Sequence, residues 1–161
     1  MKFLTLIKEE IDRQRFINSA INMDYSELDA EDIVDGLIEK YKTLPKKLTL
    51  YRIIRADEYS DIDLRRLGKH YSDNKEELLT NYEFSTGVGD KVFLFTVVVD
   101  KRFVDVQQSI ENNILYPNEN EITLKNEGKD VKIEDVEDVT NMGEDYPEFT
   151  EDWFLSTIKY L

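Results

Sequence analysis

The stretch Val92-Phe93-Leu94-Phe95-Thr96-Val97-Val98-Val99 decides the fold class of this chain. It is apolar almost throughout and rich in β-branched and aromatic residues, which is typical of a strand buried on both faces. The segment 48–54 changes to a period of two and predicts another strand. Shorter strands are expected at 104–106, 121–124 and 131–133. The middle of the chain is therefore expected to form a sheet.

Helices are expected mainly before this sheet. Within residues 1–45, apolar side chains recur near the helical period of 3.6, first over 4–21 and again over 30–41. Pro45 ends the second helix, because the residue before a proline avoids the α region. A further helix is expected to run to Tyr82, capped by Ser72 or Asp73.

Helices followed mostly by strands indicate an α+β fold. At 161 residues, the chain is long enough to bury a core as a single domain, 1–161, without disulfides or metal. We expect a helical part at 1–45, a core at 47–134, and at 135–161 an acidic connection followed by a segment that docks on the core. The charged run 134–151 is expected to be an exposed connection.

Composition excludes several kinds of site. The chain has no cysteine, which excludes disulfides, zinc–thiolate sites and cysteine nucleophiles. His70 is the only histidine and no metal-binding spacing surrounds it, so no metal is expected. The chain also lacks the glycine-rich patterns of Rossmann and P-loop nucleotide sites.

The net charge of −14 bears on partners and location. Acidic surfaces repel phosphates, so direct binding to nucleic acid is not expected, whereas basic proteins are favoured partners. The apolar run at the N-terminus stops at Lys8, which is too short for a signal peptide. No later stretch has the length and hydrophobicity of a membrane span. We therefore expect a cytoplasmic protein without membrane contact.

Arg52 and the pair Ser85-Thr86 are the first candidate site residues. Alternation places Arg52 on the same face of its strand as Leu48 and Leu50. A guanidinium there needs an anionic partner, which is either an acidic side chain of the chain or a bound phosphate. The hydroxyls of Ser85-Thr86 either form a turn with the glycines that follow or orient a carboxylate or a ribose.

Glu119-Asn120-Glu121 is the third candidate. In an extended backbone, residues i and i+2 project to the same face, so both acids are expected to point the same way. They are either solvated surface acids or a pair that divides two tasks, charge stabilisation and proton acceptance. Such a pair suits reactions that pass through an oxocarbenium ion. The departure of nicotinamide from NAD⁺ is such a reaction and needs no acid, because the leaving group becomes neutral.

The order of these candidates resembles the arginine-serine-glutamate class of mono-ADP-ribosyltransferases, in particular its small bacterial and phage enzymes. The order is Arg52, then Phe84-Ser85-Thr86 before a long strand, then Glu119-Asn120-Glu121. The resemblance covers residues 47–134 and includes an aromatic residue, Tyr116, three positions before the first glutamate. Gly87 stands where the family has a second serine. The resemblance implies N-terminal helices packed on a mainly antiparallel split β-sandwich of ADP-ribosyltransferase type.

The resemblance also implies roles in a reaction with NAD⁺ as substrate and no metal. Arg52 would bind the NAD phosphates and brace the cleft, and the backbone of Ile53 would hold the nicotinamide carboxamide. Ser85, with Thr86 beside it, would orient the catalytic glutamate and the nicotinamide ribose. Glu121 would bind the ribose 2′-hydroxyl and stabilise the oxocarbenium ion.

The same resemblance implies that the acceptor is a protein, modified on arginine. Glu119 would position and deprotonate the arginine, and Tyr116 would help to recognise the target.

Three other functions remain open from the sequence. In the first, the chain would be an acidic binding protein that imitates a DNA phosphate backbone. In the second, it would be an inactive transferase fold kept for protein–protein interaction. In the third, it would be an enzyme that transfers ADP-ribose to water.

Overall fold

The computed structural model describes residues 11–80, 88–117 and 120–140. These residues form four α-helices and five β-strands, with short 3-10 turns between them. The helices are α2 (Arg13–Asn22), α3 (Glu27–Lys42), α4 (Lys75–Thr80) and α5 (Val106–Leu115). The strands are β1 (Lys47–Ala56), β2 (His70–Ser72), β3 (Lys91–Asp100), β4 (Glu121–Thr123) and β5 (Lys132–Asp138). The predicted α+β fold is confirmed.

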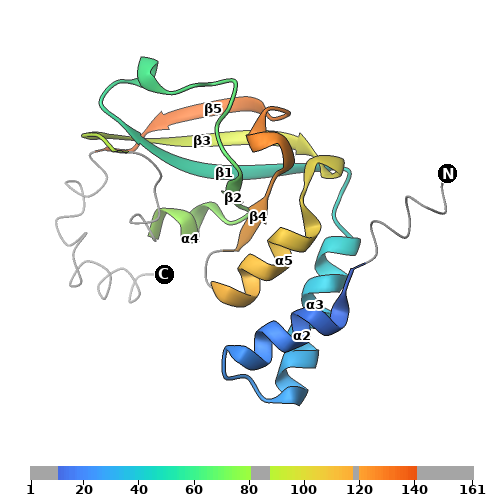
Figure 1. The fold of residues 1–161 in the computed structure, drawn as a ribbon. Coiled ribbons are helices and arrows are strands. Elements are labelled where there is room, and N and C mark those ends of the chain that lie inside the picture. The colour runs from blue at the N-terminus through green and yellow to red at the C-terminus, as the bar shows by residue number, and fades with distance from the viewer. Residues whose placement is uncertain (1–10, 81–87, 118–119, 141–161) are drawn as a thin grey trace.

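The strands form one antiparallel sheet in the order β4-β2-β1-β3-β5 (Figure 1). Its centre is the pairing of β1 with β3, which extends over ten residues of each strand, from Lys47 opposite Asp100 to Ala56 opposite Lys91. The apolar residues of β3 are buried, as their composition predicted, except Val98, which is half-buried. All the described strands belong to this sheet.

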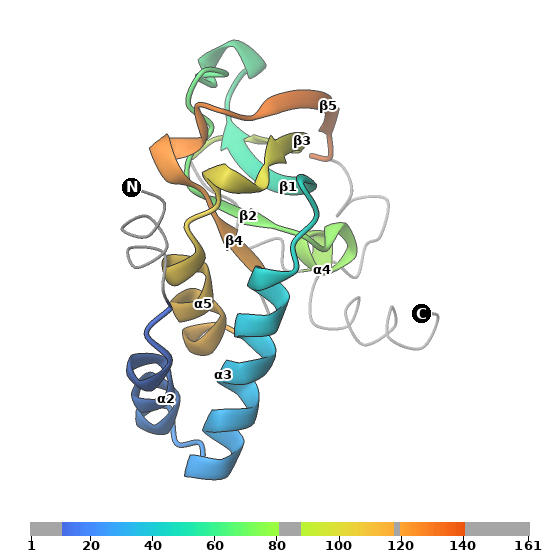
Figure 2. The same ribbon diagram turned by 90° about the vertical axis from the view of Figure 1, so that its right-hand side faces the viewer.

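Three helices stand together at the β4 edge of the sheet (Figures 1 and 2). Helices α2 and α3 form a hairpin that packs on α5, and α5 packs on β4. Their apolar faces share a core with the sheet that includes Phe16, Ile17, Ala20, Val34, Leu50, Phe95, Ile110 and Ile114. On the opposite face of the sheet, Leu78 and Leu79 of α4 pack on Ile53, Val92 and Leu94.

Helix α5 corrects the sequence-based expectation for residues 104–118. Only Val104 of the predicted strand 104–106 pairs, through an isolated bridge to Leu124. The helix then begins after Asp105, whose side chain accepts a hydrogen bond from the backbone N–H of Gln108 at 3.1 Å. Residues 106–115 are therefore helix.

Two further boundaries differ from expectation. Ser72 lies in β2 and is not a helix cap. The first turn of α4 is instead capped by Asn74, which accepts a hydrogen bond from the backbone N–H of Glu77 at 3.0 Å. At the other edge of the sheet, β5 extends to Asp138, so the first part of the charged run 134–151 is strand. Its exposed charges suit an edge strand, because they oppose pairing with another chain.

Within residues 11–80, 88–117 and 120–140, no helix has the length and hydrophobicity that crossing a membrane requires. The predicted helical turns at 4–10 and the docking segment at 152–158 lie outside these residues.

Candidate functional site

Strand β4 brings Glu121 to the middle of a buried polar cluster. The strand pairs with β2 so that Glu121 lies opposite Ser72, and Thr123 lies opposite His70. Helix α5 covers the outer side of β4, and Glu121 is only 7% exposed. A carboxylate in this position requires hydrogen-bond donors, because burial of an unpaired charge is costly.

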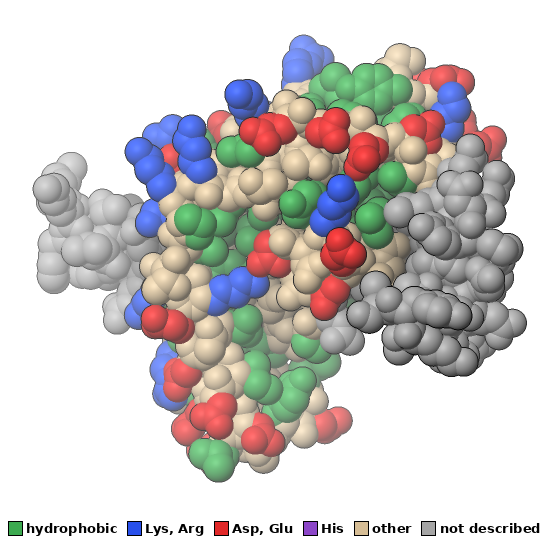
Figure 3. Space-filling model, turned by 180° about the vertical axis from the view of Figure 1, so that it is seen from behind, with side chains coloured by type: hydrophobic (Ala, Val, Ile, Leu, Met, Phe, Trp, Pro, Cys, Tyr) green, Lys and Arg blue, Asp and Glu red, His purple; other side chains and the backbone are tan. Residues whose placement is uncertain are grey.

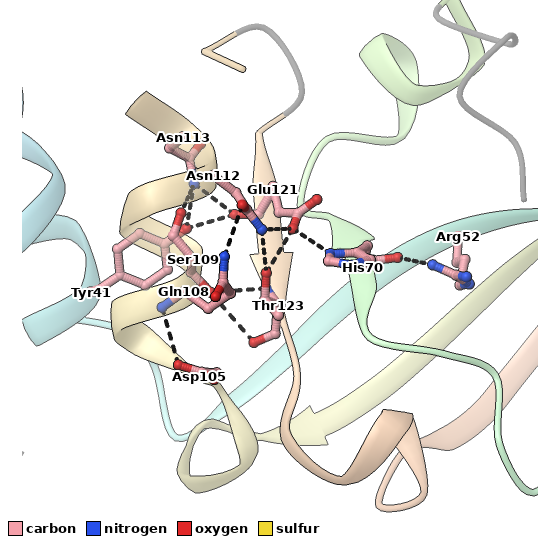
Figure 4. A network of polar contacts seen from close by, with 10 residues as sticks. All are labelled: Tyr41, Arg52, His70, Asp105, Gln108, Ser109, Asn112, Asn113, Glu121 and Thr123. Carbon is pink, nitrogen blue, oxygen red and sulfur yellow. Dashed lines mark hydrogen bonds and ion pairs between the residues drawn. The ribbon is translucent and has the colours of Figure 1, made fainter. Parts of the chain in front are cut away.

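One oxygen of the Glu121 carboxylate receives three hydrogen bonds (Figure 4). The donors to Oε2 are His70 Nδ1 at 2.7 Å, Asn112 Nδ2 at 2.7 Å and Thr123 Oγ1 at 2.6 Å. The other oxygen, Oε1, receives no hydrogen bond from any residue that the structure describes. Within the described part of the chain, the carboxylate is therefore held through Oε2 alone.

These donors favour the ionised form of Glu121. Burial raises the pKa of the carboxyl group. The three hydrogen bonds, together with the positive charge that His70 carries when protonated, act in the opposite direction and are stronger in sum. The pKa of Glu121 therefore lies below its ordinary value, and the group is an anion at neutral pH.

The helices also hold the backbone of Glu121. Its carbonyl oxygen accepts hydrogen bonds from the hydroxyl of Tyr41 on α3 at 2.6 Å and from Asn113 Nδ2 on α5 at 2.8 Å. Asn113 Nδ2 also lies 2.9 Å from the Tyr41 hydroxyl. The position of Glu121 is thus determined by two helices as well as by strand pairing.

His70 connects this cluster to the surface. Its Nδ1 contacts the buried carboxylate of Glu121, while 55% of the side chain is exposed. Because an ionised carboxylate only accepts hydrogen bonds, Nδ1 carries the hydrogen in this contact. His70 was not predicted as a site residue, because no sequence pattern places a lone histidine beside a glutamate 51 residues away.

Arg52 approaches the cluster from the other face of the sheet. Tyr51 pairs with Ser72, and Ser72 pairs with Glu121, so these three side chains share one face. Arg52, the neighbour of Tyr51, points to the opposite face. This is the face of Leu48 and Leu50, as the alternation predicted.

The guanidinium of Arg52 contacts the strand that carries His70. Nη1 donates a hydrogen bond to the carbonyl oxygen of His70, and Cζ lies 5.7 Å from the centre of the Tyr71 ring. Arg52 is only 8% exposed, and burial lowers its pKa. Gly68 passes so close that a Cβ there would lie 2.6 Å from Nη2. Through these contacts Arg52 braces strand β2, and its role toward the NAD phosphates stays a prediction.

The other predicted site residues are less completely placed. Ser85, Thr86 and Glu119 lie outside the described residues. The expectation that Glu119 and Glu121 project to one face assumed an extended backbone. Asn120 between them has a φ of 48°, in the left-handed region, so the backbone is not extended there. The direction of Glu119 stays a prediction.

Two predicted residues lie in very different surroundings. Tyr116 follows the last turn of α5 and is 56% exposed, so its ring is accessible to a partner. Ile53 is buried under α4, in register with Leu94 of β3. Its backbone therefore lies in the interior of the sheet.

Among the described residues, no three histidine or acidic side chains are grouped as metal ligands would be. Comparison with known proteins finds no family model, no curated protein and no solved structure that matches this chain.

Proposed function

We propose that the chain cleaves the nicotinamide–ribose bond of NAD⁺ and transfers ADP-ribose to a protein. The observation that carries this proposal is the state of Glu121: a buried, ionised carboxylate with Oε2 fixed by three donors and Oε1 without a donor among the described residues. An immobilised anion stabilises a cationic transition state without reorganisation when the charge develops. An oxocarbenium ion is such a transition state.

NAD⁺ suits this site better than an ordinary glycoside does. Glycoside hydrolysis requires a second carboxyl group to protonate the leaving oxygen. Among the described residues, the partners of the Glu121 carboxylate are a histidine, an amide and a hydroxyl, with no second acid. Nicotinamide leaves a cationic ring and becomes neutral, so its departure needs a stabilising anion alone.

The predicted order of site residues also supports the proposal, with one replacement. The resemblance requires a residue that hydrogen-bonds to the catalytic glutamate, and we assign this role to His70 in place of Ser85. Arg52 braces His70 through its carbonyl group. Glu121 binds the ribose 2′-hydroxyl through Oε1 and stabilises the oxocarbenium ion.

The proposed acceptor and the proposed fold type are those that the resemblance to mono-ADP-ribosyltransferases implies. Glu119 followed by Glu121 implies an arginine acceptor, and exposed Tyr116 is available to contact the target protein. The proposed ADP-ribosyltransferase type of the fold is supported only by the α+β class, a five-stranded antiparallel sheet with three helices at its β4 edge.

An acidic binding protein is the second candidate. In its favour, residues 16–39 carry several acids and no lysine, arginine or histidine. A DNA mimic needs carboxylates in continuous rows, however. On the face in Figure 3, acidic side chains are interspersed with basic and hydrophobic ones. Binding to a basic DNA-binding protein that persists without NAD⁺ would favour this candidate over the transferase.

The transferase proposal is tested by incubating the protein with labelled NAD⁺ and a cell lysate. We expect label on protein, loss of label with Glu121→Gln, and retention with Glu111→Gln, a partly buried acid on α5 that contacts Ser19 and not Glu121. Loss of label with Glu119→Gln, but not of nicotinamide release, would support the arginine acceptor. The proposal fails if Glu121→Gln labels as well as the unaltered chain.

A further inference from the structure

We propose that His70 is a general base that deprotonates a hydroxyl acceptor, with water as the simplest one, when that acceptor attacks the ribose of NAD⁺. This inference rests on the proposed function and assigns a second acceptor class to the same site. It would give the chain an NAD hydrolase activity that is independent of Glu119.

The orientation of the His70 ring is the first support. Nδ1 is held at 2.7 Å by Glu121 Oε2, which makes Nδ1 the protonated nitrogen of the neutral ring. Nε2 then carries the lone pair. Nε2 makes no hydrogen bond to any residue in the described part of the chain, and the side chain is 55% exposed. In enzymes that use histidine as a base, a carboxylate fixes one ring nitrogen of the histidine while the other ring nitrogen accepts the proton.

The supports behind Glu121 are the second observation. Its Oε2 is also bound by Thr123 and by Asn112, whose own Oδ1 accepts a hydrogen bond from Gln108 Nε2 at 3.0 Å. The carboxylate therefore cannot rotate away from His70 without loss of these bonds. Among the described residues, the charged groups that contact His70 are Glu121 on β4 and Arg52 on β1, at the ring and at the carbonyl group respectively.

Glu121 is poorly suited to be the base itself. Its Oε2 is fully occupied, and its Oε1 is assigned to the ribose. A carboxylate whose pKa lies below the ordinary value is also a weak proton acceptor. Histidine side chains accept protons near neutral pH, and the adjacent anion stabilises the imidazolium that forms.

Nicotinamide departs with both electrons of the bond between its nitrogen and ribose C1′. The hydroxyl oxygen forms a new bond to C1′, and its proton passes to Nε2 of His70. With water as acceptor, the products are ADP-ribose, nicotinamide and one proton, which the imidazolium later returns to solvent. A guanidinium acceptor would instead depend on Glu119.

The test measures ADP-ribose formed from NAD⁺ by the full chain and by two variants. His70→Asn keeps an N–H donor at the position of Nδ1 but lacks the base, and His70→Ala lacks both. General bases contribute about 10²–10⁴-fold to rate, so we expect a loss of about 100-fold or more in each. Added imidazole should restore activity to His70→Ala.

The outcomes separate this inference from the proposed function. Unchanged ADP-ribose formation in His70→Asn, or no response of folded His70→Ala to imidazole, would overturn the role of His70 and leave NAD⁺ cleavage intact. In His70→Asn, transfer to agmatine, a small guanidinium acceptor, should fall less than ADP-ribose formation does, because transfer loses only the contact that orients Glu121 and not a base. If the unaltered chain releases no nicotinamide from NAD⁺, the proposed function fails and the role of His70 fails with it.

Discussion

Asn112→Ala should destabilise the protein by removing one of the three donors to Glu121. The amide of Asn112 lies 2.7 Å from Glu121 Oε2 and 3.1 Å from Thr123 Oγ1, and all three residues are buried. After the substitution, the carboxylate keeps its bonds from His70 and Thr123. Gln108 Nε2 loses its acceptor but is partly exposed and can turn to water.

The size of this effect follows from the charge of the acceptor. A hydrogen bond to an ionised group contributes about 1.5–3 kcal/mol when the group is buried. Alanine is the better helix former by about 0.6 kcal/mol, which offsets part of the loss. We expect a net decrease of about 2 kcal/mol in the free energy of unfolding. For a chain of this length, that corresponds to a fall in Tm of about 4–8 °C.

Urea and thermal unfolding at pH 7, followed by circular dichroism, measure this decrease. Asn18→Ala is the matched control, because Asn18 is an exposed asparagine on α2 whose side chain only accepts a hydrogen bond from Gln14. It should change stability by less than about 0.5 kcal/mol. Equal stability of the Asn112→Ala and Asn18→Ala variants would refute the view that the donors stabilise a buried anion.

Two further changes follow from the same surroundings. Gly68→Ala should lower the free energy of unfolding by at least about 2 kcal/mol, because φ is +111° and the new Cβ meets the Arg52 guanidinium. Gly36→Ala on α3, where nothing lies within 4 Å of the new Cβ, should instead raise it by about 1 kcal/mol. Similar denaturant midpoints of the two variants would contradict this prediction. Because the folded pKa of Glu121 is lowered, its contribution to stability is present above the unfolded value of about 4.5 and is lost as pH falls below it. Acid unfolding of Glu121→Gln should therefore depend less on pH, and equal slopes would count against the ionised state.

The strands at the centre of the sheet could be predicted from the sequence because their signal is local. The continuous apolar run of β3 and the segment 48–54 within β1 require burial whatever surrounds them, and the two strands pair along their whole length. The face of Arg52 followed from the same alternation. What it reaches there, the carbonyl of His70, depends on strand pairing that no local pattern encodes.

Helix α5 was missed because its polar residues are weak helix formers. Asn112 and Asn113 favour turns in isolation, but here their amides bind Glu121 across the helix–strand contact. Asp105 as a cap and the four-residue spacing of Val106 and Ile110 were the available signals.

Glu121 was identified as a candidate from its motif, but its burial was not predicted. Strand β4 lies at the edge of the sheet and α5 packs on it, so the carboxylate is buried and fixed. The resemblance implied an orienting role for Ser85, which lies outside the described residues. The contact with His70 arises from the register of β2 and β4, which sequence spacing alone does not reveal.

Single-turnover release of nicotinamide from NAD⁺ tests the role of Glu121 most directly, because it needs no knowledge of the acceptor. The measurement compares the unaltered chain with Glu121→Gln and with Glu111→Gln, each saturated with NAD⁺. Removal of a preorganised electrostatic group typically costs about 10²–10³-fold in rate, so Glu121→Gln should slow release to that extent while Glu111→Gln does not. Release at the same rate from Glu121→Gln and the unaltered chain, or no release from either, would contradict the account.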